Sequence, residues 1–112
     1  MSNIIKLRDF VKSSRNSSDV LDECFVLYKN GNIKVKNTVK NILSDLNPKE
    51  EIVIRMYHGL DYTKQLNEEK IGIRLGVVKS QVERLYHTGI SKLKSSSRIK
   101  ILVDILEEIK HD

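Results

Sequence analysis

Two short amphipathic segments of this chain are separated by only three residues, Gly76-Val77-Val78, and this spacing restricts the fold more than any other feature. Before the junction, Ile71 and Leu75 lie four residues apart, which puts both on one side of a helix over 68–75. After it, apolar or small residues recur every three or four positions and predict a helix over 79–94 with one buried stripe: Val82, Leu85, Gly89 and Leu93. Gly76 suits the left-handed conformation that ends many helices. Gly72 leaves room for a crossing helix, so we expect the two helices to pack across a tight turn.

Two helices joined by a three- or four-residue turn containing Gly have the spacing of a helix-turn-helix, which places its second helix in the DNA major groove. The side of the 79–94 helix opposite its apolar stripe is polar. It carries groups that we expect to point outward: Lys79, Ser80, Gln81, Glu83, Arg84 and Tyr86. This pattern predicts a DNA-recognition face, with these candidate contacts: Lys79, Ser80, Gln81, Glu83 and Arg84.

Several further pieces of sequence flank the turn in a fixed order. They are Leu46-Asn47-Pro48-Lys49-Glu50-Glu51, Val53-Ile54-Arg55-Met56, Gly59-Leu60-Asp61, Glu69-Lys70-Ile71-Gly72, Arg74-Leu75-Gly76-Val77, Val82, Leu85, Lys92-Leu93-Lys94, and a tail with Ser97-Arg98, Leu102 and Leu106. Together these pieces resemble region four of bacterial primary-type sigma factors. The resemblance covers the chain from about residue 46 to its end.

The resemblance implies the role of that region, which binds the −35 element of promoters and the flap tip of RNA polymerase. In the family, the first, second and fifth residues of the recognition helix meet the −35 bases. The matching positions here are Lys79, Ser80 and Glu83. The resemblance also implies candidate contacts to DNA phosphates, at Lys49, Lys92 and Lys94.

The chain departs from the family in the recognition helix. Val78 stands where the family has a capping Ser or Thr, and a lost cap costs on the order of 1 kcal/mol. Lys79 can donate to guanine but lacks the fork of Arg. Glu83 replaces an Arg donor with a carboxylate, which can accept from cytosine N4 but repels phosphate. Gly89 replaces an Ala, at up to roughly 1 kcal/mol of helix stability. Either the protein reads a different DNA sequence or it binds DNA weakly, with Arg84 in part replacing the lost donor.

Composition favours an all-α fold with one core. The chain has 112 residues, of which 39% are hydrophobic and 31% charged, with one Pro and no Trp. The formal net charge is +5, and the segment 79–100 holds six basic residues against Glu83 alone. This excess permits a nucleic-acid partner, and it is equally typical of a solvated lysine-rich surface.

The sequence gives little support for a disulfide, a membrane span, a metal site or a phosphate-binding loop. Cys24 is the only cysteine, so an intramolecular disulfide is excluded, and we expect it to pack as a small hydrophobe. No run of residues approaches the roughly 18 apolar residues of a membrane span, and no signal peptide is evident, so we expect a cytoplasmic protein. His58, His87 and His111 lack metal-ligand spacing, and no Gly-rich phosphate loop occurs. We therefore expect no enzyme activity, no metal and no cofactor.

The remaining segments read as further helices. Residues 3–12 place Ile4, Leu7 and Val11 on one helical face. A second helix is expected over 19–29, capped by Asn16 or Ser18, and a third over 33–46. Further helices are expected from Asn47-Pro48 to Gly59 and, after a break at 95–97, over 98–110. We divide the chain into an N-terminal helical extension, 1–45, and a region-four-like domain, 46–112. The extension either completes the core of that domain or forms a docking surface. The last helix either packs on the helix-turn-helix or offers an apolar ridge to a partner.

We weigh three functions for a chain with this sequence. The first is a transcription regulator or split sigma component of phage or mobile-element type, which binds RNA polymerase and promoter DNA. Because 45 N-terminal residues are too few for the family's region two, a second protein would have to supply −10 recognition. The second is an adaptor or inhibitor that binds polymerase or a sigma factor without sequence-specific DNA contact. A relative of this second type is the small helix-turn-helix protein associated with signal-recognition-particle genes, which would imply RNA contact. The third is an enzyme, which the residues support least.

Overall fold

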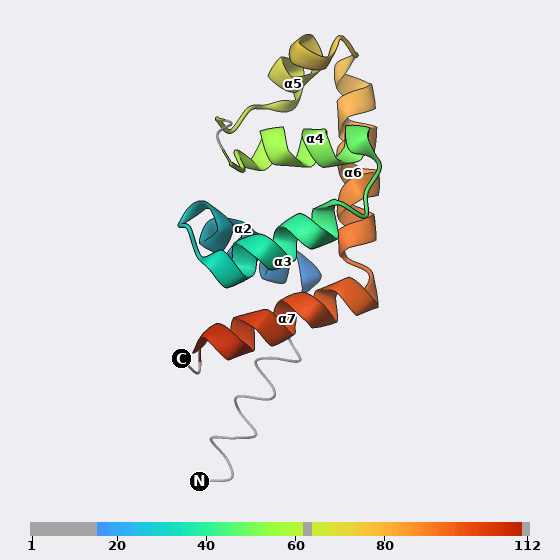
Figure 1. The fold of residues 1–112 in the computed structure, drawn as a ribbon. Coiled ribbons are helices and arrows are strands. Elements are labelled where there is room, and N and C mark those ends of the chain that lie inside the picture. The colour runs from blue at the N-terminus through green and yellow to red at the C-terminus, as the bar shows by residue number, and fades with distance from the viewer. Residues whose placement is uncertain (1–15, 62–63, 111–112) are drawn as a thin grey trace, which may run out of the picture.

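Every regular element in the described part of the chain, residues 16–61 and 64–110 of a computed structural model, is a helix (Figure 1). The helices are α2 (Ser17–Lys29), α3 (Ile33–Leu43), α4 (Pro48–His58), α5 (Glu68–Leu75), α6 (Lys79–Leu93) and α7 (Ser96–Lys110). The all-α prediction is confirmed. The helix expected over residues 3–12 lies outside the described residues.

Asparagine side chains begin four of these helices. In each case Oδ1 accepts a hydrogen bond from the backbone N–H three residues later, at 2.8 to 3.0 Å; the four caps are Asn16, Asn32, Asn47 and Asn67. Asn16 rather than Ser18 therefore caps α2. At α4, Glu50 returns the bond to the backbone N–H of Asn47 and completes a capping box, with Pro48 in the first turn.

Helix ends follow local hydrogen bonding. Gly59 and Gly76 end α4 and α5 in the left-handed conformation, with φ of 64° and 71°. The expected helix 33–46 stops at Leu43. The N–H of Ser44 still bonds four residues back, to Lys40, but those of Asp45 and Leu46 bond three residues back in tight turns. The expected break at 95–97 is shorter, since the N–H of Ile99 already donates to the Ser95 carbonyl and α7 begins at Ser96.

The interior forms two neighbouring cores. The first joins α2, α3 and α7 and includes Cys24, which is fully buried. The second lies inside the helix-turn-helix unit and consists of Val53, Met56, Ile71 and Val82. Two helices contribute to both cores: α4 through Ile54 and Val53, and α6 through Leu93 and Val82. This sharing fixes the N-terminal helices relative to α6, which runs along the long side of the molecule (Figure 1).

The last helix packs on the N-terminal extension. Leu102 and Leu106 are each 1% exposed, and α7 contacts both α2 and α3. Its apolar stripe is thus used within the chain and is not a free ridge for a partner. Helices α2 and α3 in turn complete the core that contains Ile54, Leu60 and Leu93. The division at residue 45/46 stays a prediction.

A polar cluster also joins α2 to the end of α4. The hydroxyl of Tyr28 donates to Asp61 Oδ1 at 2.5 Å and accepts from Arg55 Nη1 at 3.2 Å. Arg55 forms ion pairs with Asp61 and with Glu51. Asp61 has a φ of 62°, a backbone conformation uncommon for a residue with a side chain, and these bonds hold it there.

Candidate nucleic-acid interface

The turn between α5 and α6 depends on two glycines. Gly76 takes the left-handed conformation, and the N–H of Val77 donates to the Gly72 carbonyl at 2.9 Å. A Cβ atom placed on Gly72 would lie 2.7 Å from the Val77 carbonyl oxygen, which is closer than van der Waals contact permits. Gly72 is therefore required for the close approach of the turn. The crossing helix α6, for which the sequence predicts that Gly72 leaves room, would make only an ordinary contact with that Cβ atom, through Val82 Cγ2 at 3.6 Å.

Helix α6 begins without a side-chain cap. Val78 occupies the N-cap position, makes no capping hydrogen bond, and is 67% exposed. The predicted loss of a cap is confirmed. Helix α6 nevertheless begins at Lys79, because the Val78 carbonyl accepts from the N–H of Gln81 and of Val82. The first turn contains no acidic residue of its own to complement the positive end of the helix dipole.

The predicted recognition residues differ in how far their side chains are exposed to solvent. Lys79, Ser80 and Arg84 are exposed, whereas Gln81 and Glu83 are half-buried. The exposed three provide an ammonium, a hydroxyl and a guanidinium, all of which can donate to base edges or phosphates. None of the five is placed in the core.

Two carboxyl groups meet across the helix-turn-helix. A hydrogen bond with Glu83 of α6 raises the pKa of Glu68 in the first turn of α5, with smaller contributions from burial and from the charge of Glu83, while Lys79 opposes the shift. Glu83 therefore faces Glu68 within the protein. The sequence pattern does not indicate this pairing, because it joins residues on two different helices.

Tyr86, which the sequence pattern also predicts to point outward, turns toward α4. Its hydroxyl lies 2.8 Å from Nε2 of His58, and its ring packs on Tyr57 with centroids 4.5 Å apart. Burial raises the pKa of Tyr86 to about 12. The reason is periodicity: Tyr86 follows the buried Val82 by four residues and so lies on the same side of α6.

The three predicted phosphate contacts lie in different surroundings. Lys49 is exposed in the first turn of α4, and Lys94 is half-buried at the end of α6. Lys92 donates from Nζ to both carboxylate oxygens of Glu50, at 2.8 and 3.0 Å. Glu50 is 3% exposed, so the Lys92 ammonium neutralises a buried charge.

Among residues 16–61 and 64–110 there is no group of three or more His, Cys, Asp or Glu side chains that could hold a metal ion. Within that part of the chain, no helix has both the length and the apolar character needed to cross a membrane.

The fold and the geometry of α5, the turn and α6 define a helix-turn-helix protein. Over 73 residues the chain is 32% identical to RNA polymerase sigma factor SigA of Listeria monocytogenes, a match that covers 65% of this chain and 20% of the relative. It is also 32% identical over 73 residues to SigA of Clostridium acetobutylicum, and 28% identical over 65 residues to SigA2 of Synechococcus elongatus. The chain therefore contains a sigma-factor-like region, and the predicted resemblance is confirmed.

The similarity is partial. The matched part of this chain corresponds to about a fifth of the length of these sigma factors. No family model matches the sequence, and no solved structure matches it.

Proposed function

We propose that this chain is a transcription regulator or a component of a split sigma factor, which binds promoter DNA through α5 and α6 and binds RNA polymerase at the β flap. The observation that supports this most directly is a helix-turn-helix with exposed donors on its second helix, inside a region similar to RNA polymerase sigma factors. In this proposal, Lys79, Ser80 and Arg84 meet the base edges of the −35 region. Lys49 and Lys94 contact phosphates, and Lys92 contributes only the part of its charge that Glu50 does not neutralise.

Polymerase contact needs apolar surface outside the two cores. Ile73 on α5 is 76% exposed and Ile52 on α4 is 39% exposed. Both side chains lie outside the two cores, on helices of the sigma-like region, and are accessible to a partner protein. We propose these two side chains as contacts of the flap tip, and a second protein as the source of −10 recognition.

A second function is favoured by one specific observation. The carboxyl groups of Glu68 and Glu83 meet on the helix-turn-helix, where phosphates of bound DNA would approach. An adaptor or inhibitor that occupies polymerase without reading DNA would not be weakened by these charges. The two functions share the polymerase surface and differ only in α6.

A DNA selection separates these two functions. The full chain is used to enrich duplexes from a random pool, and the affinity for the enriched site is measured for Lys79→Ala and Arg84→Ala. Loss of one base contact of this kind costs roughly 1–3 kcal/mol, or about fivefold to 150-fold in affinity. Lys40→Ala on the exposed side of α3 is the matched control and leaves the affinity unchanged. If no site is enriched, the DNA-reading function is rejected and the adaptor function is retained.

A further inference from the structure

Val78 contributes neither a cap nor core packing to the free protein. It occupies the N-cap of α6, where a Ser, Thr, Asn or Asp side chain would accept a backbone hydrogen bond, and it makes no such bond. Its side chain is 67% exposed and belongs to neither of the two cores, so its methyl groups lie largely in water. The stability of the fold therefore does not explain a valine at the start of the recognition helix.

The backbone holds the Val78 side chain in a defined position. The residue has extended φ and ψ angles of −75° and 155°, and its carbonyl accepts from the N–H groups of Gln81 and Val82, at 3.0 and 3.2 Å. The preceding residue is anchored as well, since the N–H of Val77 donates to the Gly72 carbonyl. Because valine branches at Cβ, few χ1 rotamers are open to it. Its methyl groups thus lose little conformational entropy when they meet another surface.

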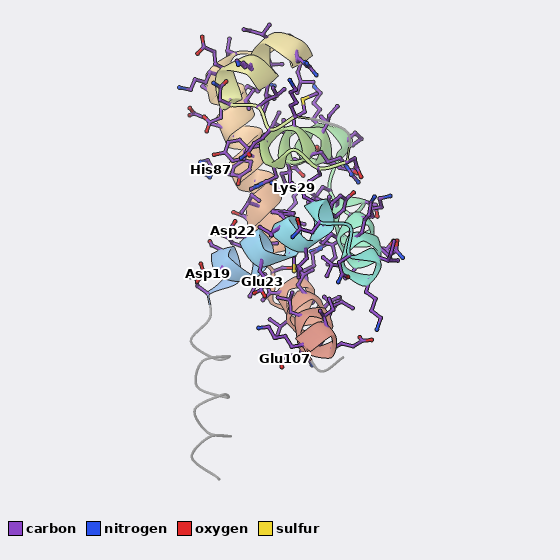
Figure 2. The ribbon with its side chains drawn as sticks, turned by 90° about the vertical axis from the view of Figure 1, so that its left-hand side faces the viewer. Asp19, Asp22, Glu23, Lys29, His87 and Glu107 are labelled. Carbon is purple, nitrogen blue, oxygen red and sulfur yellow. The ribbon has the colours of Figure 1, made fainter. Side chains whose placement is uncertain are left out.

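The residues next to Val78 belong to the proposed DNA interface. Lys79 and Ser80 follow it directly, and both are exposed. The N-terminal residues of the second helix of a helix-turn-helix contact base edges in the major groove, so a duplex contacted by Lys79 and Ser80 also lies beside Val78. Figure 2 shows α5 and the start of α6 at one end of the molecule, with Asp22 of α2 and Glu107 of α7 toward the other. These two carboxylates therefore lie away from DNA bound at the turn.

We propose that Val78 is a specificity-determining residue, which recognises a thymine in the major groove by contact with its 5-methyl group. This inference rests on the proposed DNA-reading function and deepens it. The thymine methyl is an apolar group exposed in the major groove, and small apolar side chains recognise it by contact. Cytosine carries a hydrogen atom at the same position and would leave the valine without this contact. A valine in place of the family's Ser or Thr thereby exchanges a helix cap for a base contact.

Removal of the methyl group from the DNA tests the inference. Each thymine of the duplex enriched by the full chain is replaced in turn by deoxyuridine, which differs only in lacking the 5-methyl group. We expect the affinity of the unaltered chain to fall about threefold to fivefold at one thymine, because burial of one methyl group contributes roughly that factor. If deoxyuridine has no effect at any position, the inference is overturned, while the enriched site still supports the DNA-reading function. If no site is enriched, the DNA-reading function and this inference are both rejected.

A variant of Val78 tests whether this side chain is the partner of the thymine methyl. Val78→Ser removes both methyl groups and supplies the missing cap, so the folded protein should be at least as stable as before. We expect it to bind the thymine duplex about threefold to fivefold more weakly, with no further loss when deoxyuridine replaces the thymine. Val26→Ser, at an exposed position of α2, is the matched control and keeps the full deoxyuridine effect. An undiminished deoxyuridine effect in Val78→Ser would overturn the inference, because another side chain would then contact the methyl group.

Discussion

Lys92 of α6 holds the carboxylate of Glu50 on α4 with two hydrogen bonds, at 2.8 and 3.0 Å. Glu50 is the only charged side chain among the buried residues of the described chain, and it also accepts the N–H of Asn47 at 3.3 Å. The pair therefore ties the first turn of α4 to the last turns of α6. A lysine that the family resemblance predicts as a phosphate contact therefore also helps to hold α6 on α4.

Lys92→Ala should destabilise the protein. Removal of the ammonium leaves the buried Glu50 carboxylate with only the Asn47 amide as a donor, and leaving a buried charge without its partner costs a few kcal/mol. Because the Lys92 side chain is 44% exposed, solvent screens the pair, and we expect a loss of about 1–2 kcal/mol. Chemical denaturation measures it. Lys49→Ala, at an exposed position, should change stability by less than about 0.5 kcal/mol, and equal losses in the two variants would refute the structural role of Lys92.

Local features of this fold could be predicted from sequence, and long-range ones could not. The caps at Asn47 and Asn67, the ends at Gly59 and Gly76, and the uncapped start at Val78 each depend on neighbours within four residues. The Lys92–Glu50 and Tyr86–His58 pairs join residues 42 and 28 positions apart. A periodic pattern identifies a buried face but does not identify the helix against which it packs. The same limit applies to α7, whose stripe was evident while its partners, α2 and α3, were not.

A double-mutant cycle tests the packing of α6 on α4. A Cβ atom at Gly89 would lie 2.7 Å from Cδ1 of Ile54, which is fully buried. Gly89→Ala should therefore lose stability by about 1 kcal/mol, in spite of a helix-propensity gain of similar size. Ile54→Val removes that methyl group and alone costs about 1 kcal/mol. The double variant should be more stable than the sum of the two losses predicts, and strict additivity in urea denaturation would show that the two positions do not touch.

The folded state should become less stable as the pH is lowered, because of His58. Burial, mainly, lowers the pKa of His58 from 6.5 to about 4, and its ring stacks on Phe25 with centroids 4.4 Å apart. The unfolded chain takes up a proton near the ordinary pKa, whereas the folded chain does not until about pH 4. The stability contributed by neutral His58 is thus present above the ordinary pKa and is lost as the pH falls toward 4.

The variant His58→Gln isolates this contribution, since it keeps a hydrogen-bonding group beside Tyr86 but does not titrate in this range. Thermal unfolding of both proteins is compared between neutral pH and pH 4. The difference in melting temperature between them should narrow or reverse as the pH falls. A difference that stays constant would mean that His58 titrates alike in the folded and unfolded chains.

Glu83→Gln should strengthen DNA binding. The change removes one of two carboxylates that meet at Glu68, and it lowers the repulsion of phosphates without altering the size of the side chain. We expect an affinity gain of about twofold to fivefold, corresponding to roughly 0.5–1 kcal/mol. Glu69→Gln removes the same charge from an exposed position in the same first turn of α5 and serves as the matched control. Equal gains in both would indicate a net-charge effect alone.

The central claim, a polymerase-binding module of sigma type, is tested most directly by a pull-down of RNA polymerase with the tagged full chain. The polymerase is used intact and with its flap tip deleted, and Ile73→Asp is compared with Lys40→Asp, which introduces the same charge on the exposed side of α3. The account predicts that intact polymerase is retained by the unaltered chain and by Lys40→Asp, and that retention is lost with the deletion and with Ile73→Asp. Absence of polymerase in every case would contradict the sigma-type mechanism, and retention without the flap tip would contradict the proposed docking surface.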